Sequence, residues 1–117
     1  MKLEDYRNYC LSLKGAEEGF PFDATTIVFT IKGKMFSLSD IDKFEFINVK
    51  CDPEIIIDLR ERYEGVIPGY HMNKNHWNSI LTNSRISDKL IKEWIKNSYD
   101  LVVKGLPKKL QKELTDE

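Results

Sequence analysis

The chain has 117 residues, 41% hydrophobic and 32% charged, which describes a soluble globular protein of one ordinary-sized domain. The formal net charge of −1 provides no global attraction to nucleic acid or anionic lipid, so such binding would need a local patch. The N-terminal residues lack an apolar signal region and no apolar run is long enough to span a bilayer, so we expect a cytoplasmic protein without membrane contact.

A helix is expected first, over residues 3–13. Apolar side chains recur there at spacings of three and four and form one stripe, made of Leu3, Tyr6, Cys10 and Leu13. Residues 17–22 form an irregular lead-in with two aromatic side chains. The spacing of apolar side chains then changes from a helical to a strand-like pattern. Residues 26–31 and 35–38 are rich in β-branched and aromatic side chains and flank Lys32-Gly33-Lys34, which predicts a β-hairpin.

Residues 44–51 predict a third strand. Alternation divides its side chains between two faces, with Ile47, Val49 and Cys51 on one and Phe44, Phe46, Asn48 and Lys50 on the other. A helix is then expected to start at Asp52-Pro53, because Asp52 can cap free backbone N–H groups and Pro53 suits the first helical position. This helix is expected to continue to about residue 63, before Gly65.

The second half of the chain predicts a turn at Pro68-Gly69, a fourth strand over residues 76–82 and a last long helix. Ser87 is the expected cap of that helix, and Gly105 is well placed to end it. Trp94 lies at the centre of its regular apolar stripe, so we expect this side chain to be buried against the sheet.

The expected order is helix, three strands, helix, strand, helix. Consecutive strands joined by short turns form an antiparallel sheet, and we expect the helices to cover one of its faces. The chain is therefore predicted to be an α+β two-layer sandwich, a single domain over residues 1–117 and a monomer. Residues 104–117 are expected to form a polar, lysine-rich tail of that domain.

Residues 68–78 combine side chains that neither a core segment nor a plain linker would carry. They hold a turn dipeptide, both histidines, a tyrosine, a tryptophan, a lysine and three asparagines. Loops that combine aromatic rings, amides and a cation are typical of recognition surfaces. We therefore expect a binding site in this segment.

Motifs spread over nearly the whole chain form a specific pattern: Phe20-Pro21-Phe22, Gly33-Lys34-Met35-Phe36, residues 48–54, residues 68–74, His76-Trp77-Asn78, Ser98-Tyr99 and residues 101–107. Together they resemble the MmcQ/YjbR family. That resemblance implies a frataxin-like (CyaY-like) fold, with an antiparallel sheet flanked by helices. It also implies DNA binding, the label that proteins of this family commonly carry by analogy to a double-wing arrangement. Asn75 departs from the pattern, since the family often has a second lysine there.

The leading hypothesis is a non-enzymatic domain that binds DNA or RNA through the hairpin tip at residues 32–34 and the loop at residues 68–78. Lysines would contact phosphates, and aromatic rings of the loop would stack on bases. The candidate residues are Lys32, Lys34, Lys50, Tyr70, His71, Asn73, Lys74, His76 and Trp77. In the alternative interpretation of the same residues, the lysines are solvated and the aromatics pack against the sheet edge.

A second hypothesis is a regulatory or scaffold module that binds a protein or a small anionic ligand through the Tyr70–Trp77 surface. Phe44 and Phe46 are expected on the sheet face without helices, where a loop, a partner or a ligand must cover them. The 68–78 loop closing on the sheet as a minor core is the structural alternative. One positive face joining the hairpin and loop lysines would favour nucleic acid, whereas an apolar pocket beside Trp77 would favour a ligand.

Catalysis, metal binding and cofactors are not expected. His71 and His76 are five residues apart and lack the spacing of a zinc site. Cys51 precedes the expected helix start, which can lower a thiol pKa, but its inward register favours a buried, inert thiol. Cys10 is also expected to be a buried, inert thiol. A disulfide between Cys10 and Cys51 is disfavoured in a reducing compartment. No glycine-rich phosphate loop or paired-carboxylate signature is present.

Overall fold

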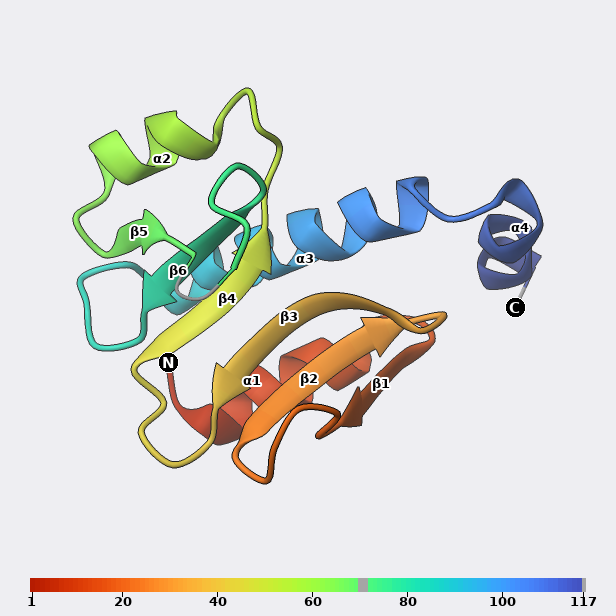
Figure 1. The fold of residues 1–117 in the computed structure, drawn as a ribbon, viewed down its shortest axis with the longest axis horizontal. Coiled ribbons are helices and arrows are strands. Elements are labelled where there is room, and N and C mark those ends of the chain that lie inside the picture. Colours follow the sequence, from red (N-terminus) through yellow and green to blue (C-terminus); the bar gives the residue numbers. More distant parts are fainter. Residues whose placement is uncertain (70–71, 117) are drawn as a thin grey trace.

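The computed structural model describes residues 1–69 and 72–116. The helices and strands along this range are, in order, α1 (Leu3–Ser12), β1 (Ala16–Gly19), β2 (Thr26–Ile31), β3 (Lys34–Asp40), β4 (Phe46–Lys50), α2 (Ile56–Arg62), β5 (Val66–Pro68), β6 (Trp77–Leu81), α3 (Asp88–Lys104) and α4 (Lys108–Asp116). The strands form one antiparallel sheet in the order β1-β2-β3-β4-β6-β5 (Figure 1). Within this range, no helix has the length and hydrophobicity that a membrane span requires.

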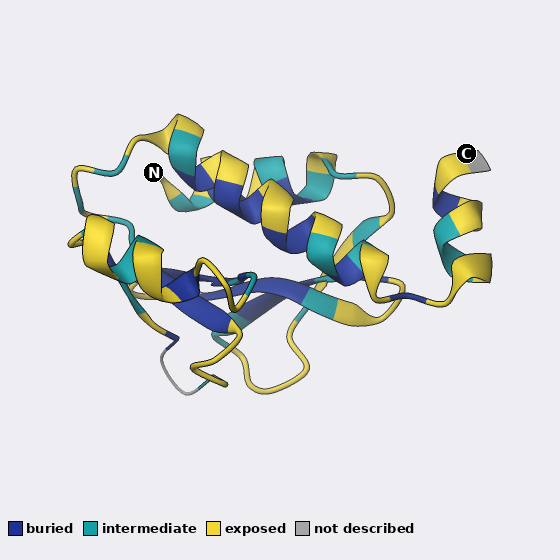
Figure 2. Ribbon diagram, turned by 90° about the horizontal axis from the view of Figure 1, so that it is seen from above, coloured by how far each residue is buried: buried dark blue, intermediate teal, exposed yellow. Residues whose placement is uncertain are grey.

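The helices lie on one side of the sheet, so the predicted α+β two-layer sandwich is confirmed (Figure 2). Helix α3 packs against β2, β3 and β4, α1 packs against β1, and α2 packs against β5 and β6. The core between the layers is rich in aromatic rings. Tyr6 meets Phe29 edge to face with ring centres 5.2 Å apart, and Phe36 meets Tyr99 in the same way at 5.4 Å. All four rings are buried, which is the main apolar stabilisation of this layer.

Two local predictions are confirmed at atomic detail. The β2–β3 hairpin turns on Lys32 and Gly33, both with positive φ (50° and 78°), as the two-residue turns that match the twist of paired strands require. Helix α3 begins after Ser87, whose Oγ accepts a hydrogen bond from the Leu90 N–H at 3.2 Å. In both places, residues adjacent in sequence supply the whole signal.

Strands β3 and β4 share two registered pairs, whereas β4 and β6 share five. Buried hydroxyls supply further links between β3 and β4. The Ser37 hydroxyl donates to the Asn48 carbonyl at 2.8 Å, and the Ser39 hydroxyl donates to the Phe46 carbonyl at 2.6 Å. We call this boundary the β3–β4 seam.

Helix α3 also takes part in the β3–β4 seam. The fully buried Ser98 hydroxyl accepts from the Lys50 N–H at 2.8 Å and donates to the Phe36 carbonyl at 2.6 Å. One side chain of α3 therefore satisfies a backbone donor of β4 and a backbone acceptor of β3. Such buried backbone groups are costly when unpaired, so Ser98 fixes the end of β4 relative to α3.

The prediction that a helix starts at Asp52-Pro53 was wrong, because α2 begins at Ile56. Asp52 stabilises a turn instead. Its Oδ1 accepts from the Glu54 N–H at 2.9 Å, and its carbonyl accepts from the N–H groups of Ile55 and Ile56, both at 3.0 Å. The side-chain oxygen of an aspartate can cap a helix or close an Asx turn, and the Asp52 oxygen closes a turn.

The prediction that Phe44 shares the helix-free sheet face with Phe46 was also wrong. Phe44 precedes β4 and has a positive φ of 44°, which breaks the strand alternation. Its ring lies 5.6 Å from that of Tyr6, on the helix side. Ile47 and Val49 point into the helix-side core as expected.

The structure adds short elements at its edges that the sequence analysis did not assign. Residues 16–19 and 66–68 pair as the outer strands β1 and β5. Within the stretch expected to be a polar tail, α4 forms and buries Leu114, while Leu106 is buried just before it. Lys32 at the hairpin tip contacts Glu113 of α4, with its Nζ 3.2 Å from the carboxylate.

Candidate functional site

The hairpin tip carries the first predicted site residues. Lys32 and Lys34 are both exposed. The Lys32 ammonium is paired with Glu113, while the Lys34 ammonium has no hydrogen bond or ion pair within the described residues. Of these two lysines, only Lys34 presents a charge that is not already paired.

In the 68–78 loop, Tyr70 and His71 lie outside the described residues. Asn73 holds the rest of the loop in shape, because its Oδ1 accepts from the Asn75 N–H at 2.9 Å and its carbonyl accepts from the N–H groups of His76 and Trp77. Asn73 and His76 are exposed. The side chain of Asn73, a candidate binding residue from the sequence, thus has a structural role in the turn.

Lys74 lies beside α2, where its carbonyl accepts a hydrogen bond from Arg60. Its side chain is exposed. The hairpin tip, in contrast, lies beside α4 (Figure 1). The structure therefore does not bring Lys32 and Lys34 together with Lys74 at one place on the molecule.

Trp77 is only 8% exposed. It packs with Val28 and Leu38 on the sheet face opposite the helices, and Met35 and Met72 border the cluster. Its ring is therefore a member of a second, smaller core and is not free to stack on a base.

The rest of the helix-free face is hollowed into a depression that we call the open-face groove. Its apolar lining comes from Phe22, Met35, Leu38, Phe46 and Met72. Its charged lining comprises Asp23, Asp40 and Glu45 against one lysine, Lys43. Hydrogen bonds from the backbone of Thr26 and Thr25 lower the pKa of Asp23, so this carboxylate stays ionised. Three carboxylates against one ammonium disfavour a polyanion on this face.

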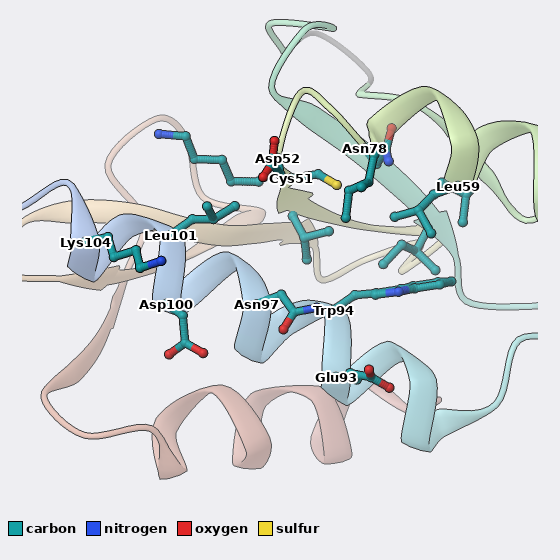
Figure 3. A pocket seen from close by; sticks show the side chains of 15 residues that line it. Cys51, Asp52, Leu59, Asn78, Glu93, Trp94, Asn97, Asp100, Leu101 and Lys104 are labelled. Carbon is teal, nitrogen blue, oxygen red and sulfur yellow. The ribbon is translucent and has the colours of Figure 1, made fainter.

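A second hollow, of about 400 Å³, lies on the helix side between α2, α3 and the ends of β4 and β6 (Figure 3). We call it the α2–α3 pocket. Its apolar walls come from all the surrounding elements: Val49, Ile55, Leu59, Val66, Ile80, Trp94 and Leu101. Leu59 and Trp94 face each other across one part of it in Figure 3.

The pocket exists because α2 is fixed over β6. The buried amide of Asn78 accepts from Arg60 Nε at 2.7 Å and donates to the Ile56 carbonyl at 3.4 Å. Just after α2, the Tyr63 ring packs edge to face on the Trp94 ring of α3, with ring centres 5.1 Å apart. The α2 segment thus contacts β6 through Arg60 and α3 through Tyr63.

The polar residues that line the pocket come from the end of β4, from the segment after it and from α3. They are Lys50, Asp52, Glu93, Asn97, Asp100 and Lys104. The Cys51 thiol also lines the pocket, and burial followed by the charge of Asp52 raises its pKa. Cys51 therefore stays protonated and is a poor nucleophile. Among the described residues, no group of three or more histidine, cysteine, aspartate or glutamate side chains could hold a metal ion.

The family model described as YjbR matches residues 11–101. The chain belongs to the YjbR family. It is 40% identical over 110 residues to YbdF of Escherichia coli O157:H7, covering 93% of this chain and 90% of that protein. It is 25% identical over 113 residues to YjbR of Escherichia coli strain K12, covering 96% of each. The resemblance to the MmcQ/YjbR family is thereby confirmed.

Solved structures agree with the fold of this YjbR-family domain. The crystal structure of Deinococcus radiodurans protein DR2400, a DUF419 domain, matches with a TM-score of 0.90 and 36% identity, over 97% of this chain and 88% of that one. A Pseudomonas syringae protein matches with a TM-score of 0.73 and 26% identity, over 86% and 98%.

Sequence analysis missed the α2–α3 pocket of this YjbR-family domain. Trp94 was expected to be buried in the stripe of the last helix, and it is buried, but this pattern does not show that a space remains between α2 and α3. Asn78 was the available signal. A buried amide on a strand has to be paired, and here its partner is the arginine that holds α2 in place.

Proposed function

We propose that this YjbR-family domain is a non-catalytic binding module that takes a small ligand in the α2–α3 pocket. The observation that carries the proposal is the pocket itself. Its volume of about 400 Å³ lies in the range of small-molecule sites, and such sites combine mostly apolar walls with a few polar groups, as here. The site differs from the Tyr70–Trp77 surface considered from sequence, because Trp77 is buried in a core of its own.

The chemistry of the pocket supports binding without catalysis. The lining thiol of Cys51 has a raised pKa, and among the described residues no histidine lines the pocket to act as a base. The lining amide of Asn78 is already occupied by Arg60 and the Ile56 carbonyl. No described side chain there is both activated and aimed at a bound molecule.

The test is a fragment screen by ligand-observed NMR, with hits located by amide shifts at Val66 and Ile80. Leu59→Trp should fill the pocket and abolish these hits. Ile57→Trp is the matched control, because Ile57 lies on the same helix but is 58% exposed. Leu101→Trp blocks the pocket from α3 if the first variant loses thermal stability. The proposal fails if no fragment shifts these amides, or if fragments bind equally well to both blocked variants.

Nucleic-acid binding is the second candidate, because one cationic region does form. Helix α4 lies beside the hairpin tip, so its exposed lysines Lys108, Lys109 and Lys112 are added to Lys34. Phosphates could be contacted there without base readout. The acidic open-face groove and the buried Trp77 count against the wider surface that the sequence indicated.

Binding to random duplex DNA, single-stranded DNA and RNA across a salt series tests this candidate. Lys34→Ala should weaken binding equally for all sequences and reduce the salt slope by about one, as should Lys74→Ala if the loop takes part. Trp77→Ala should instead lower the thermal midpoint, since Trp77 is a core residue. Absence of affinity at low salt would reject nucleic-acid binding.

A further inference from the structure

The open-face groove combines an apolar lining with exposed carboxylates. It has a volume of about 670 Å³ and lies on the sheet face opposite the helices (Figure 2). Two methionines line it, Met35 and Met72, and Phe22, which also lines it, is 65% exposed. Large exposed apolar side chains beside a hollow are typical of binding surfaces, and unbranched methionines adapt to partners of different shape. The groove therefore offers the apolar contacts that a partner segment requires.

Charged residues are sorted along the strands β2, β3 and β4. Thr26 of β2 pairs with Asp40 of β3 at one end of their hairpin, Ile31 pairs with Lys34 at the other, and β4 runs antiparallel to β3. The basic end therefore has Lys32, Lys34 and Lys50. The charged residues that line the groove all come from the opposite end: Asp23, Asp40, Lys43 and Glu45. A groove at this acidic end attracts cations and repels polyanions.

Two carboxylates of the groove are available to a partner. Within the described residues, the Glu45 carboxylate forms no hydrogen bond or ion pair, and Asp40 uses only Oδ1, which accepts from the Asp42 N–H at 2.8 Å. The Asp23 carboxylate is already engaged by the two threonines that follow it in the chain. Lys43 forms no ion pair in the described part of the chain. The carboxylates that line the groove thus outnumber its ammonium group by two.

We propose that the open-face groove binds a basic peptide segment of a partner protein, with lysine or arginine beside apolar side chains. The apolar side chains of the peptide contact Phe22 and the two methionines, where they bury apolar area. Its cations pair with Asp40 and Glu45. A simple alkylamine carries one positive charge, whereas a peptide with two basic residues also balances the second negative charge of the lining. This contact is separate from ligand binding in the α2–α3 pocket, which lies on the other side of the sheet.

Fluorescence anisotropy with short labelled peptides tests the proposal. The probe is a peptide of lysine and leucine, and its controls replace lysine by glutamate or leucine by serine. The lysine–leucine peptide should bind most tightly and weaken with added salt, since the ion pairs are exposed. Asp40→Asn keeps an acceptor oxygen for the Asp42 N–H, and Glu45→Gln removes no described hydrogen bond. Each should weaken binding about threefold, as for an exposed ion pair. Glu61→Gln is the matched control, because Glu61 is an exposed residue of α2 that does not line the groove.

Phe22→Ser should weaken binding of the lysine–leucine peptide about fivefold, because burial of part of an aromatic ring is lost. Phe20→Ser is its control, since Phe20 is 46% exposed but does not line the groove. Leu59→Trp should leave peptide binding unchanged.

Three results would overturn the proposal. The first is no peptide binding at low salt, or equal affinity for the glutamate–leucine or the lysine–serine peptide. The second is an equal loss in Phe20→Ser and Phe22→Ser, or in Glu61→Gln and Glu45→Gln, which would place the contact outside the groove. The third is displacement of the peptide by octylamine or spermine at equal concentration, which would assign the groove to a small amine.

Discussion

Replacement of Ser98 by alanine should destabilise this protein much more than the loss of one small hydroxyl group normally does. Ser98 is fully buried and pairs two backbone groups, the Lys50 N–H at 2.8 Å and the Phe36 carbonyl at 2.6 Å. Each group left unsatisfied in the interior costs about 1–3 kcal/mol. Alanine recovers a few tenths of a kcal/mol in helix propensity. We therefore expect the free energy of unfolding to fall by about 2–5 kcal/mol.

Urea denaturation followed by circular dichroism measures this loss, with an unchanged m-value showing that only stability has changed. Ser12→Ala is the matched control. Ser12 is also a helical serine, and its hydroxyl donates to the Tyr9 carbonyl, but it is exposed, so its loss should change stability by less than about 0.5 kcal/mol. A loss at Ser98 as small as that of the control would refute the view that its hydroxyl joins β3, β4 and α3.

Three further outcomes are expected. Trp94→Ala should cost about 3–5 kcal/mol in equilibrium denaturation, and a loss below about 1 kcal/mol would remove this ring from the core. Cys10 and Cys51 should react slowly with a thiol reagent in the native state, because burial raises the pKa of both thiols. Fast native labelling of Cys51 would contradict its placement. The hydrogen bond from Arg7 lowers the pKa of Glu18, so their ion pair stabilises the fold above the ordinary carboxyl pKa and is lost as the pH falls through the lowered value. The thermal midpoints of wild type and Glu18→Gln should therefore differ at about pH 7 and converge at about pH 3, and a difference that persists in acid would contradict this assignment.

Interactions between near neighbours in the chain explain what could be predicted without coordinates. The Lys32-Gly33 turn, the Ser87 cap and the stripe centred on Trp94 all depend on residues within a few positions of one another. The alternation of Ile47 and Val49 is local in the same sense, and it correctly placed the core face of β4. With the short turns between strands, these signals were enough to determine an α+β sandwich with an antiparallel sheet.

Other features depend on residues far apart in the chain. Asp52 can close a turn or cap a helix with equal local chemistry, and α2 is held in its observed place by the contact of Arg60 with Asn78, eighteen residues away. Trp77 belongs to a minor core because the pairing of β6 with β4 places it opposite Lys50, on the face without helices.

The α2–α3 pocket is the clearest case. Its walls come from residues between Val49 and Lys104, and most of its apolar residues, such as Val49, Ile80 and Trp94, have the pattern of an ordinary core position. Whether such residues touch or leave a space depends on the distance between two helices, and no periodicity in the sequence encodes that distance. Local sequence patterns therefore predicted the α+β class and the core face of β4, whereas contacts between residues far apart in the chain place the α2–α3 pocket.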